Sequence, residues 1–475
     1  MNKPKTEELV SKLCLDWCGK EATKIEKIAG SGSSRQYYRL HIDNGPVVAV
    51  FNQDIRENKA FLEFTRHFKK KGLPVPAVIY TGSAPETFLL EDLGDTSLFM
   101  LLSKSREKSG SLSEELKRLY LKVVEYLPEF QSVTGDSLPW GYCYPRQAFD
   151  RQSMLWDLSY FKYYFLKLAK VAFNEEALED DFNALAGFLL EVPLQHFMYR
   201  DFQSRNIMIR DGSPFFIDYQ GGRKGGLQYD MASLLYDAKA DLPEEFRKEI
   251  LAHYMETANL KMPFSEPDFM RYLDGFTLIR ILQAMGAYGF RGYYENKPLF
   301  LRSIPFAVNN LRILLERSLI PVGLPELTRV LHEITGNPEF KNVKQFSPDL
   351  TVKLFSFSFK KNMPLDESGN GGGFTFDCRA LPNPGRHPEY KLLTGRDEAV
   401  KEFLGKEPAV DAFLNHTFAL ADQSVGNYIE RGFTNLMISF GCTGGRHRSV
   451  YCAEELGKYL KEKFNVMVVL THMGI

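Results

Sequence analysis

MYRDFQSRNIMIRDGSPFFIDYQ, residues 198–220, is the most informative stretch of the chain. Asp201 and Asn206 stand in a D-x-x-x-x-N pattern, and Asp218 follows directly after a short apolar run, residues 215–217. The simplest interpretation is a hairpin that carries one Asn and two Asp residues in its turns, which is a common use of these residues. Their side-chain oxygens are also the donors that a hard divalent cation prefers, so the stretch is a candidate site for chemistry on phosphate groups.

Phosphoryl transfer needs one carboxylate that orients a hydroxyl nucleophile and two oxygen donors that hold Mg²⁺ on the phosphates. Protein kinases place a base Asp and a metal-binding Asn at this spacing, and a second metal-binding Asp beyond a short hairpin. They read H-R-D where this chain reads Tyr199-Arg200-Asp201. The three residues together therefore predict phosphoryl transfer.

Length and composition set the limits of this interpretation. A chain of 475 residues is too long for one ordinary core, so two or three domains are expected. Apolar residues make up 44% and charged residues 25%, which is typical of a soluble globular protein, and a net charge of −1 gives no reason to expect a membrane or bulk nucleic acid as partner. No apolar run is long enough to span a bilayer, and six scattered cysteines indicate reduced thiols, so we expect a cytoplasmic protein.

The first hundred residues favour a small β-rich lobe. A strand over residues 24–30 leads through a Gly/Ser turn into a second strand, and residues 46–51 form a third. The turn residues Gly30, Ser31, Gly32 and Ser33 are candidates for covering nucleotide phosphates with their N–H groups, although a plain hairpin turn is the alternative.

The third strand departs from protein kinases, because Phe51 stands where they carry a phosphate-binding lysine. Arg35 and Arg39 are candidates for supplying the missing positive charge, since guanidinium suits phosphate. A helix over residues 58–71 follows, and Glu57 and Glu63 are interpreted as parts of its solvated face.

Residues 88–94, FLLEDLG, predict a strand followed by a linker, in the position where a kinase hinge meets adenine. Glu91 and Leu93 are therefore assigned to the ATP site. Residues 113–129 and 150–170 predict helices, and the aromatic stripe of the second is typical of a core. Arg151, Trp156 and Asp157 nevertheless combine a ring face with hydrogen-bonding groups, the mixture that binds sugars.

Helices then dominate to about residue 336, over residues 243–258, 266–288, 304–317 and 325–335. Asp230 precedes MASLLYDA and is interpreted as a helix N-cap. A small β-rich half followed by a large helical half predicts an α+β, protein-kinase-like two-lobe domain, with an N-lobe of about residues 1–95 and a C-lobe of about 96–335.

The glycine turn, the E-D-L-G segment, the D-x-x-x-x-N pattern and I-D-Y-Q resemble the aminoglycoside/choline phosphotransferase superfamily. Within it, S-S-R-Q-Y-Y-R is similar to the S-F-R-R-Y-F-R segment of bacterial cell-wall sugar kinases, which phosphorylate the anomeric hydroxyl of N-acetylmuramic acid or N-acetylglucosamine. The resemblance implies ATP and Mg²⁺ as cofactors, Asp201 as the base, and Asn206 and Asp218 as metal ligands. That branch also lacks the strand lysine.

Residues 336–350 have the composition of a linker, and a separate α/β domain is expected over residues 351–475. Strands are predicted at 352–359, 374–379 and 436–440, and helices at 396–406 and 408–431. The turn GCTGGRHR, residues 441–448, then leads into a helix from Ser449. A strand, a glycine-rich turn and a helix N-terminus form an anion site.

Cys442 and Arg448-Ser449 also fit the loop of protein-tyrosine phosphatases, in which a thiolate attacks phosphorus. Gly441 replaces the usual His before that Cys, and no acid loop is evident, so we favour binding over phosphatase chemistry.

The segments FSFSFK, FDCRALPNP, LTGRD and GCTGGRHRSV make residues 351–475 resemble the C-terminal domain of the RNase adapter protein RapZ. The resemblance implies a sensor of amino-sugar phosphate that also contacts RNA and protein, although the chain ends at residues 471–475 without a basic tail. The pocket residues carried over, with the remaining residues of the turn, are Arg379, Asn383, Cys442, Thr443, Gly444, Gly445, Arg446, His447 and Arg448.

The sequence as a whole predicts a sugar kinase for a small amino sugar, fused to a domain that binds a sugar phosphate or nucleotide sugar. Two alternatives stay open. One is a regulator with a degenerate kinase half that binds RNA or a partner protein, and the other is a kinase for another small alcohol, such as an aminoglycoside or choline.

Overall fold

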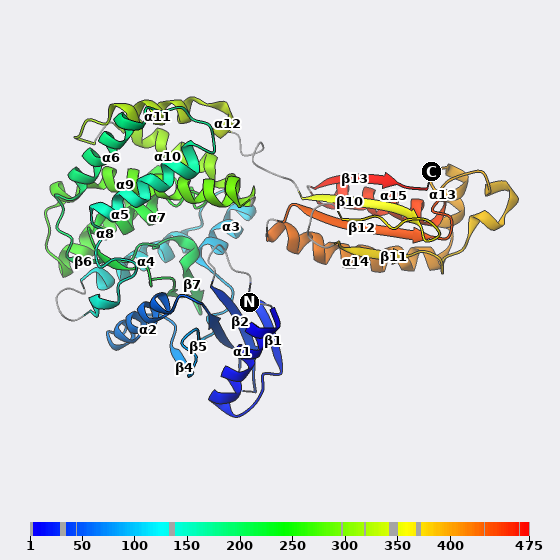
Figure 1. Cartoon of the computed structure of the whole chain (residues 1–475), viewed down its shortest axis with the longest axis horizontal. Helices are drawn as coiled ribbons and strands as arrows, with labels where there is room; N and C mark the ends of the chain where they lie inside the picture. The colour runs from blue at the N-terminus through cyan, green and yellow to red at the C-terminus, as the bar shows by residue number, and fades with distance from the viewer. Residues whose placement is uncertain are drawn as a thin grey trace. The chain divides into compact units, whose positions relative to one another are not determined.

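The structure is a computed structural model, and it describes residues 3–28, 35–43, 45–132, 138–295, 298–317, 320–341, 350–366, 372–431, 433–464 and 466–474. The chain divides into two compact units, Met1–Val343 and Lys344–Ile475 (Figure 1). In the described part, no helix is both long and apolar enough to cross a membrane.

Unit 1 begins with a five-stranded antiparallel sheet in the order β1-β2-β3-β5-β4. The strands are β1 Lys24–Ile28, β2 Gln36–His41, β3 Val47–Phe51, β4 Val78–Thr81 and β5 Thr87–Glu91. Helix α1, Lys3–Cys18, packs its buried residues Val10, Leu13 and Cys14 against the sheet. Helix α2, Ile55–Lys70, begins at the N-cap Asp54, whose carboxylate accepts the N–H groups of the first helical turn.

The rest of unit 1 is mainly helical, as the sequence predicts. Its longest helix, α9, is buried over most of its length, because helices pack around it on several sides (Figure 1). The helices are α3 Leu98–Ser109, α4 Glu114–Gln131, α5 Arg151–Phe161, α6 Glu175–Leu189, α7 Gln228–Leu235, α8 Glu244–Lys261, α9 Glu266–Gly289, α10 Ile304–Arg317, α11 Pro325–Gly336 and α12 Pro338–Lys341.

The helix predicted over residues 150–170 is shorter than expected. The α-helix ends at Phe161 and continues as a π-helical turn, Lys162–Leu166. Helix α9 approaches this turn very closely, because a Cβ atom added at Gly289 would lie 2.0 Å from the carbonyl oxygen of Tyr164. The change of helix type therefore coincides with a backbone-to-backbone contact that the aromatic stripe alone does not reveal.

Two short two-stranded antiparallel sheets, of which the second is a hairpin, hold the sequence stretch 198–220. Strand β6, His196–Met198, pairs with β9, Arg223–Gly225. Strand β7, Ile207–Arg210, pairs with β8, Ser213–Phe216. The segments before and after the second hairpin are thereby brought side by side.

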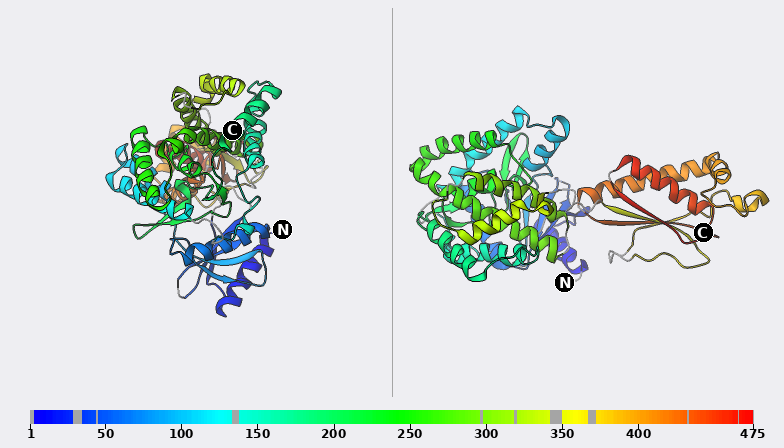
Figure 2. Two further views of the ribbon diagram at one scale, coloured as in Figure 1. Left: turned by 90° about the vertical axis from the view of Figure 1, so that its left-hand side faces the viewer. Right: turned by 90° about the horizontal axis from the view of Figure 1, so that it is seen from above.

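Unit 2 is a four-stranded parallel sheet in the order β11-β12-β10-β13. Its strands are β10 Thr351–Ser358, β11 Phe374–Asp377, β12 Asn435–Cys442 and β13 Met467–His472. Its helices are α13 Glu398–Gly405, α14 Pro408–Glu430 and α15 Arg448–Lys463. The long helices α14 and α15 lie along one face of the sheet, and the hydrophobic core lies between these helices and the sheet (Figure 2). Strand β13 was not predicted.

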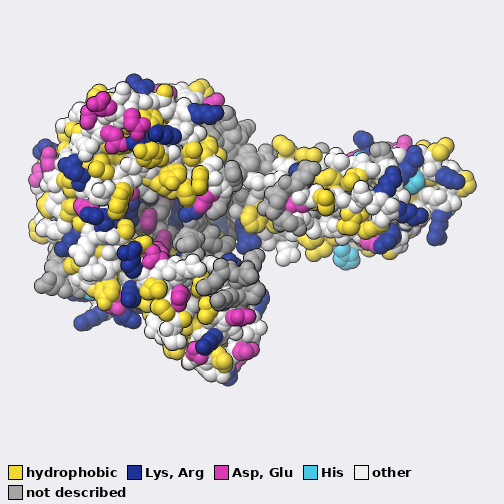
Figure 3. Space-filling model, viewed as in Figure 1, with side chains coloured by type: hydrophobic (Ala, Val, Ile, Leu, Met, Phe, Trp, Pro, Cys, Tyr) yellow, Lys and Arg dark blue, Asp and Glu magenta, His cyan; other side chains and the backbone are white. Residues whose placement is uncertain are grey.

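The distribution of charge differs between the two units. Figure 3 shows basic and acidic side chains interspersed over the visible face of unit 1. On unit 2, Lys and Arg side chains gather at the end that carries α13. In this parallel sheet the carboxyl ends of the strands meet at one edge, which is where open α/β sheets bind ligands.

Candidate active site

The loop after β6 is anchored by Asp230, which lies in the first turn of α7. Its carboxylate accepts the N–H groups of Tyr199 and Arg200, at 2.8 and 2.9 Å. Burial raises the pKa of Asp230 to about 7, although the two N–H donors act in the opposite direction. The prediction that Asp230 is an N-cap is wrong, because the residue lies inside the helix and holds the backbone that presents Asp201.

Arg200 is held in place by Asp157. Its backbone adopts a left-handed conformation with φ of 82°, and its guanidinium donates to both oxygens of Asp157, at 2.7 and 2.8 Å. The cation also lies over the rings of Phe149 and Tyr229. Asp157 therefore fixes the loop from α5, and its contact with a substrate stays a prediction.

Asp201, Asn206 and Asp218 come together at the open end of the hairpin β7–β8. The side-chain amide of Asn206 donates to the Asp201 carbonyl at 2.9 Å, and its nitrogen lies 3.4 Å from Asp218 Oδ2. Asp218 has a φ of 71° and accepts a 2.7 Å hydrogen bond from Gln220. Within the described residues, no donor reaches the side-chain oxygen of Asn206.

This donor set fits a magnesium ion. Burial raises the pKa of Asp218, and the neighbouring Asp201 carboxylate raises it further, so the site carries negative charge that a cation would compensate. No group of three or more His, Cys, Asp or Glu side chains in the described part could hold a metal by itself. Mg²⁺ commonly binds one or two protein carboxylates together with substrate phosphates, which matches Asn206 and Asp218.

Arg35, one of the two candidates for the missing positive charge, lies beside Asp218. Its side chain is only 2% exposed, and its Nη2 lies 3.0 Å from Oε1 of Glu57 in the first turn of α2. Its Nη1 lies 3.9 Å from Asp218 Oδ1. Burial lowers the pKa of Arg35, but Tyr37 and Glu57 outweigh this effect, so the net pKa is raised. The prediction of a solvated Glu57 is wrong, because this carboxylate pairs with a buried cation beside Asp218.

Arg39 is placed differently. Its guanidinium donates to Asp92 at 3.0 Å and to Asp95 at 2.9 Å, in the segment between β5 and α3. Both carboxylates raise the pKa of Arg39 through hydrogen bonds. Of the two arginines proposed from the sequence, only Arg35 lies beside Asp218.

The remaining residues assigned to ATP are less informative. The Glu91 carboxylate accepts the N–H of Ala77 at 3.0 Å and pairs with Arg210 at 2.7 Å, so it joins β5 to neighbouring segments. Leu93 is buried, and its contact with adenine stays a prediction. The turn residues Gly30, Ser31, Gly32 and Ser33 lie outside the described residues.

The three proposed sugar-binding residues of α5 have separate environments. Arg151 donates to the carbonyl of Asn183 on α6 at 3.2 Å. Trp156 is 48% exposed, and the guanidinium of Arg146 lies 5.7 Å from its ring centre. Asp157 is engaged by Arg200, as described above. The structure does not bring the three side chains together as one binding surface.

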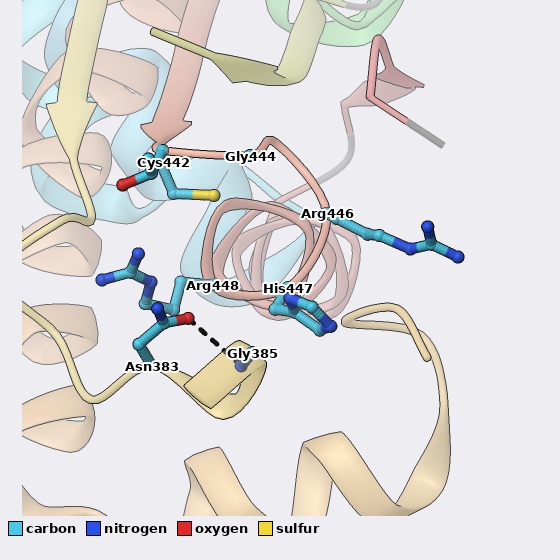
Figure 4. A pocket seen from close by; sticks show the side chains of 8 residues that line it. Asn383, Gly385, Cys442, Gly444, Arg446, His447 and Arg448 are labelled. Carbon is cyan, nitrogen blue, oxygen red and sulfur yellow. Dashed lines mark hydrogen bonds between the residues drawn. The ribbon is translucent and has the colours of Figure 1, made fainter. Parts of the chain in front are cut away.

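Unit 2 contains a cavity of about 220 Å³ where β12 passes into α15 (Figure 4). It is lined by Asn383, Gly385, Cys442, Thr443, Gly444, Arg446, His447 and Arg448. Six of these eight belong to the turn GCTGGRHR, and Asn383 was also expected, whereas Gly385 was not. Gly385 donates its N–H to the Asn383 side chain at 3.2 Å, so this short turn forms the opposite wall.

The arginines of this region have distinct partners. Arg448 is buried, and its guanidinium donates to the carbonyls of Arg379 and Leu381 at 2.8 and 3.0 Å. Its Nε finds no hydrogen-bond partner among the described residues. Arg446 donates to the carbonyls of Leu392 and Leu393 and points away from Cys442 (Figure 4).

Arg379 does not line the cavity, which corrects its assignment to the anion site. Its guanidinium pairs with both oxygens of Asp377 and lies over the ring of Phe359. Arg446 contributes to the wall, but its charge is directed to the backbone of residues 392–393. Arg448 is therefore the arginine best placed to face an anion.

Backbone donors complete the cavity. Gly445 donates its N–H to Cys442 Sγ at 3.2 Å, and in the described part of the chain no acceptor is found for the N–H groups of Thr443, Gly444 and Arg446. The N-terminus of α15 adds the positive end of a helix dipole. Unsatisfied N–H groups at a helix N-terminus are suited to bind phosphate or carboxylate.

Comparisons with known proteins agree with this division. The family model described as "Phosphotransferase enzyme family" matches residues 24–266, and that described as "RapZ C-terminal domain" matches residues 350–474. A "Nucleotide-binding protein" of Fervidobacterium nodosum is 41% identical over 137 residues, 29% of this chain and 45% of the relative. One of Desulforudis audaxviator is 40% identical over 160 residues, 31% of this chain and 53% of the relative. The chain spans about half the length of these curated relatives.

Solved structures with similar folds include two phosphotransferases. The choline kinase from Cryptosporidium parvum Iowa II has a TM-score of 0.46 and 13% identity, covering 70% of this chain and 99% of its own. The aminoglycoside phosphotransferase APH(2'')-Ib, in its ADP-bound form, has a TM-score of 0.40 and 16% identity, covering 62% and 99%. The match to the first family model covers just over half of the 475 residues. The chain therefore belongs to the phosphotransferase enzyme family, and it carries a RapZ C-terminal domain after its protein-kinase-like domain.

Proposed function

We propose that unit 1 is an ATP- and Mg²⁺-dependent kinase that phosphorylates an amino sugar, N-acetylmuramic acid or N-acetylglucosamine, at the anomeric hydroxyl in cell-wall recycling. The observation that carries the proposal is the meeting of Asp201, Asn206 and Asp218 beside the ion pair of Arg35 with Glu57. A degenerate kinase half would have no need to keep a carboxylate base, two metal donors and a buried cation together.

The residues divide the reaction between them. Asp201 accepts the proton of the acceptor hydroxyl, and Gln203 Nε2, 3.4 Å from its Oδ1, helps to orient the carboxylate. Asn206 and Asp218 would hold Mg²⁺, which neutralises phosphate charge when it is bound. Arg35, fixed by Glu57, faces the phosphates. Because its side chain is buried, water screens its attraction to the phosphates only weakly. Positioning and charge compensation supply most of the catalysis in phosphoryl transfer.

The positive charge near Asp201 favours a sugar over a cationic alcohol as the phosphate acceptor. Arg280 of α9 is buried, donates to Ser233 and Gln283 at 3.0 and 2.9 Å, and interacts electrostatically with Asp201. This buried cation near Asp201 opposes the binding of an aminoglycoside or choline, which needs carboxylates around it. A neutral or acidic amino sugar meets no such repulsion.

An ADP-release assay on the full chain tests this proposal. Purified protein with ATP and Mg²⁺ would be offered amino sugars, muramic acids, aminoglycosides and choline at matched concentrations. We expect ADP release with N-acetylmuramic acid or N-acetylglucosamine, and little with the cationic acceptors. Turnover confined to an aminoglycoside or choline would contradict the amino-sugar proposal while leaving the phosphotransferase assignment intact.

Replacing Arg35 should weaken the use of ATP. Arg35→Ala removes a charge-assisted contact that is worth about 1.5–3 kcal/mol, so the apparent KM for ATP should rise roughly tenfold to a hundredfold. Arg39→Ala is the matched control, because it removes an arginine that pairs with Asp92 and Asp95 instead. Steady-state kinetics at saturating acceptor would measure both variants. Equal KM values in Arg35→Ala and the unmodified chain would exclude Arg35 from the phosphate site.

We propose further that the cavity of unit 2 binds a sugar phosphate or nucleotide sugar without turning it over. Its backbone N–H groups, the N-terminus of α15 and Arg448 support this assignment. One unit would then produce a sugar phosphate, and the other would bind that product or a nucleotide sugar made from it. RNA or a partner protein is the alternative ligand for this domain.

Isothermal titration of the full chain with amino-sugar phosphates and UDP-sugars tests the cavity. Arg448→Lys should weaken binding about tenfold or more, because a compact ammonium lacks the extended planar guanidinium, which holds the two carbonyls on one side and presents further N–H groups to an anion. Arg446→Lys is the control and should change binding little, since its guanidinium points away.

A phosphate-release assay on the same samples distinguishes binding from phosphatase chemistry. We expect no release from the sugar phosphates. Release that disappears in Cys442→Ser would show a phosphatase and contradict the binding proposal. Absence of heat with every sugar phosphate and UDP-sugar would favour RNA or a protein as the ligand.

A further inference from the structure

Three of the six cysteines meet in the core of unit 2, at the base of the cavity. Cys442 is the last residue of β12, Cys378 follows the last residue of β11, and Cys452 lies on α15. All three are buried in the same hydrophobic cluster between the sheet and its helices. The binding proposal treats Cys442 as part of the wall and makes no use of the other two.

The register of the sheet makes Cys378 and Cys442 neighbours across two strands. Asp377 pairs with Gly441 in parallel register, and the N–H of Cys378 donates to the Gly441 carbonyl at 2.8 Å. The next residues along the two segments are Cys378 and Cys442, and both side chains face the helix-covered core. Adjacent strands lie about 4.8 Å apart, which is within the 4.4–6.8 Å range of Cα separations that a disulfide spans.

The surroundings of the two thiols differ in a way that gives them different chemistry. Cys442 Sγ lies 3.1 Å from Ser449 Oγ and accepts the N–H of Gly445 at 3.2 Å. Burial raises the pKa of Cys442, but these hydrogen bonds outweigh it, and the net pKa is lowered. A hydrogen bond with Cys452 and burial raise the pKa of Cys378 well above its ordinary value. Cys442 is therefore the more acidic of the two thiols, which favours it as the one that reacts first.

Access also favours Cys442. This residue lines the cavity, and Figure 4 shows its sulfur directed toward the N-terminus of α15. Cys378 and Cys452 do not line the cavity. A small polar oxidant that enters from solvent therefore reaches the sulfur of Cys442 first.

We propose that Cys442 is a peroxide-reactive thiolate and that Cys378 is its resolving thiol, so that oxidation joins the ends of β11 and β12 beneath the cavity. The Cys442 thiolate attacks one oxygen of hydrogen peroxide, the O–O bond breaks, and Cys442 becomes a sulfenic acid as hydroxide leaves and takes a proton from solvent to become water. The sulfur of Cys378 then attacks the sulfenic sulfur, the S–S bond forms, and the departing hydroxide takes the Cys378 proton as a second water. Two thiols supply the two electrons that reduce one peroxide.

This modification would alter the turn that borders the cavity. A disulfide removes the negative charge from Cys442 and turns its sulfur toward Cys378. Gly445 and Ser449 then lose the sulfur to which they hydrogen-bond. Because the disulfide depends only on the thiols, its formation does not rest on the ligand proposed for the cavity.

Thiol mapping of the full chain after treatment with hydrogen peroxide tests the proposal. Proteolysis and mass spectrometry of blocked samples should show a peptide pair joined through Cys378 and Cys442, and these two should be lost from the six free thiols. A thiol reductant should restore all six. In Cys378→Ala the disulfide should be lost, and dimedone, which traps sulfenic acids, should label Cys442.

Controls address folding and accessibility. Cys378→Ser is the second variant in case the alanine disturbs the core, and Cys452→Ala should retain the Cys378–Cys442 disulfide. Cys18, which is exposed on α1, reports ordinary surface oxidation in the same digest. Cys442 left unmodified while Cys18 is oxidised would overturn the proposal. So would a disulfide between Cys378 and Cys452 with Cys442 still free.

Discussion

Asp201→Ala should lower phosphoryl transfer by about 10²- to 10⁴-fold while the fold stays intact. The large effect is expected because a positioned general base contributes that much, and the described structure places no other carboxylate to receive the acceptor proton. The fold should survive because Asn206 is held by the backbone carbonyl of Asp201, which the substitution keeps. Turnover of ATP with the best acceptor is the measurement.

Asp180→Ala on α6 is the matched control, because Asp180 is an exposed aspartate away from the catalytic loop. Its turnover and thermal unfolding should equal those of the unmodified chain. If Asp201→Ala kept most of the turnover, another group would have to be the base, and the role assigned to Asp201 would be wrong.

Asp218→Asn should weaken the binding of Mg²⁺ more than it weakens the binding of the acceptor. The change keeps the shape of the side chain, and Asn tolerates the left-handed backbone found at this position. It removes a charged oxygen donor. Loss of a residue that only hydrogen-bonds to a metal ligand already weakens metal binding roughly 10- to 100-fold, so the Mg²⁺ concentration for half-maximal rate should rise by at least that factor. Kinetics over a Mg²⁺ titration would measure the shift.

Asp211→Asn is the control for this substitution. Asp211 also has a positive φ and lies in the turn of the same hairpin, but it is exposed and at the opposite end of the hairpin from Asn206 and Asp218. Its Mg²⁺ titration should match that of the unmodified chain. An unchanged titration in Asp218→Asn as well would remove Asp218 from the metal site.

The fold class could be predicted because it depends on local patterns. The glycine turn, the alternating strands and the helical second half gave an α+β two-lobe domain, which the phosphotransferase family match confirms. The second domain was predicted from long segments such as GCTGGRHRSV, and the RapZ C-terminal match confirms it. Strand β13 escaped prediction because it is a short edge strand with no strongly buried face.

The roles of Asp157, Glu57 and Asp230 could not be predicted, because each depends on a partner far away in the sequence. Asp157 meets Arg200, Glu57 meets Arg35, and Asp230 meets the backbone after β6. Local propensity assigns such residues to helix faces and caps, and only tertiary packing shows how they are paired. Arg446 illustrates the same limit, because its charge was expected in the cavity and is used on a neighbouring loop instead.

Identification of the phosphorylated product tests the central claim most directly. The full chain would be incubated with ATP, Mg²⁺ and N-acetylmuramic acid or N-acetylglucosamine, and the product examined by phosphorus NMR with coupling to the sugar protons. We predict one phosphate, coupled to the anomeric proton, on a sugar that has lost its reducing end. A phosphate on another hydroxyl, with the reducing end retained, or no transfer to either sugar, would contradict the account.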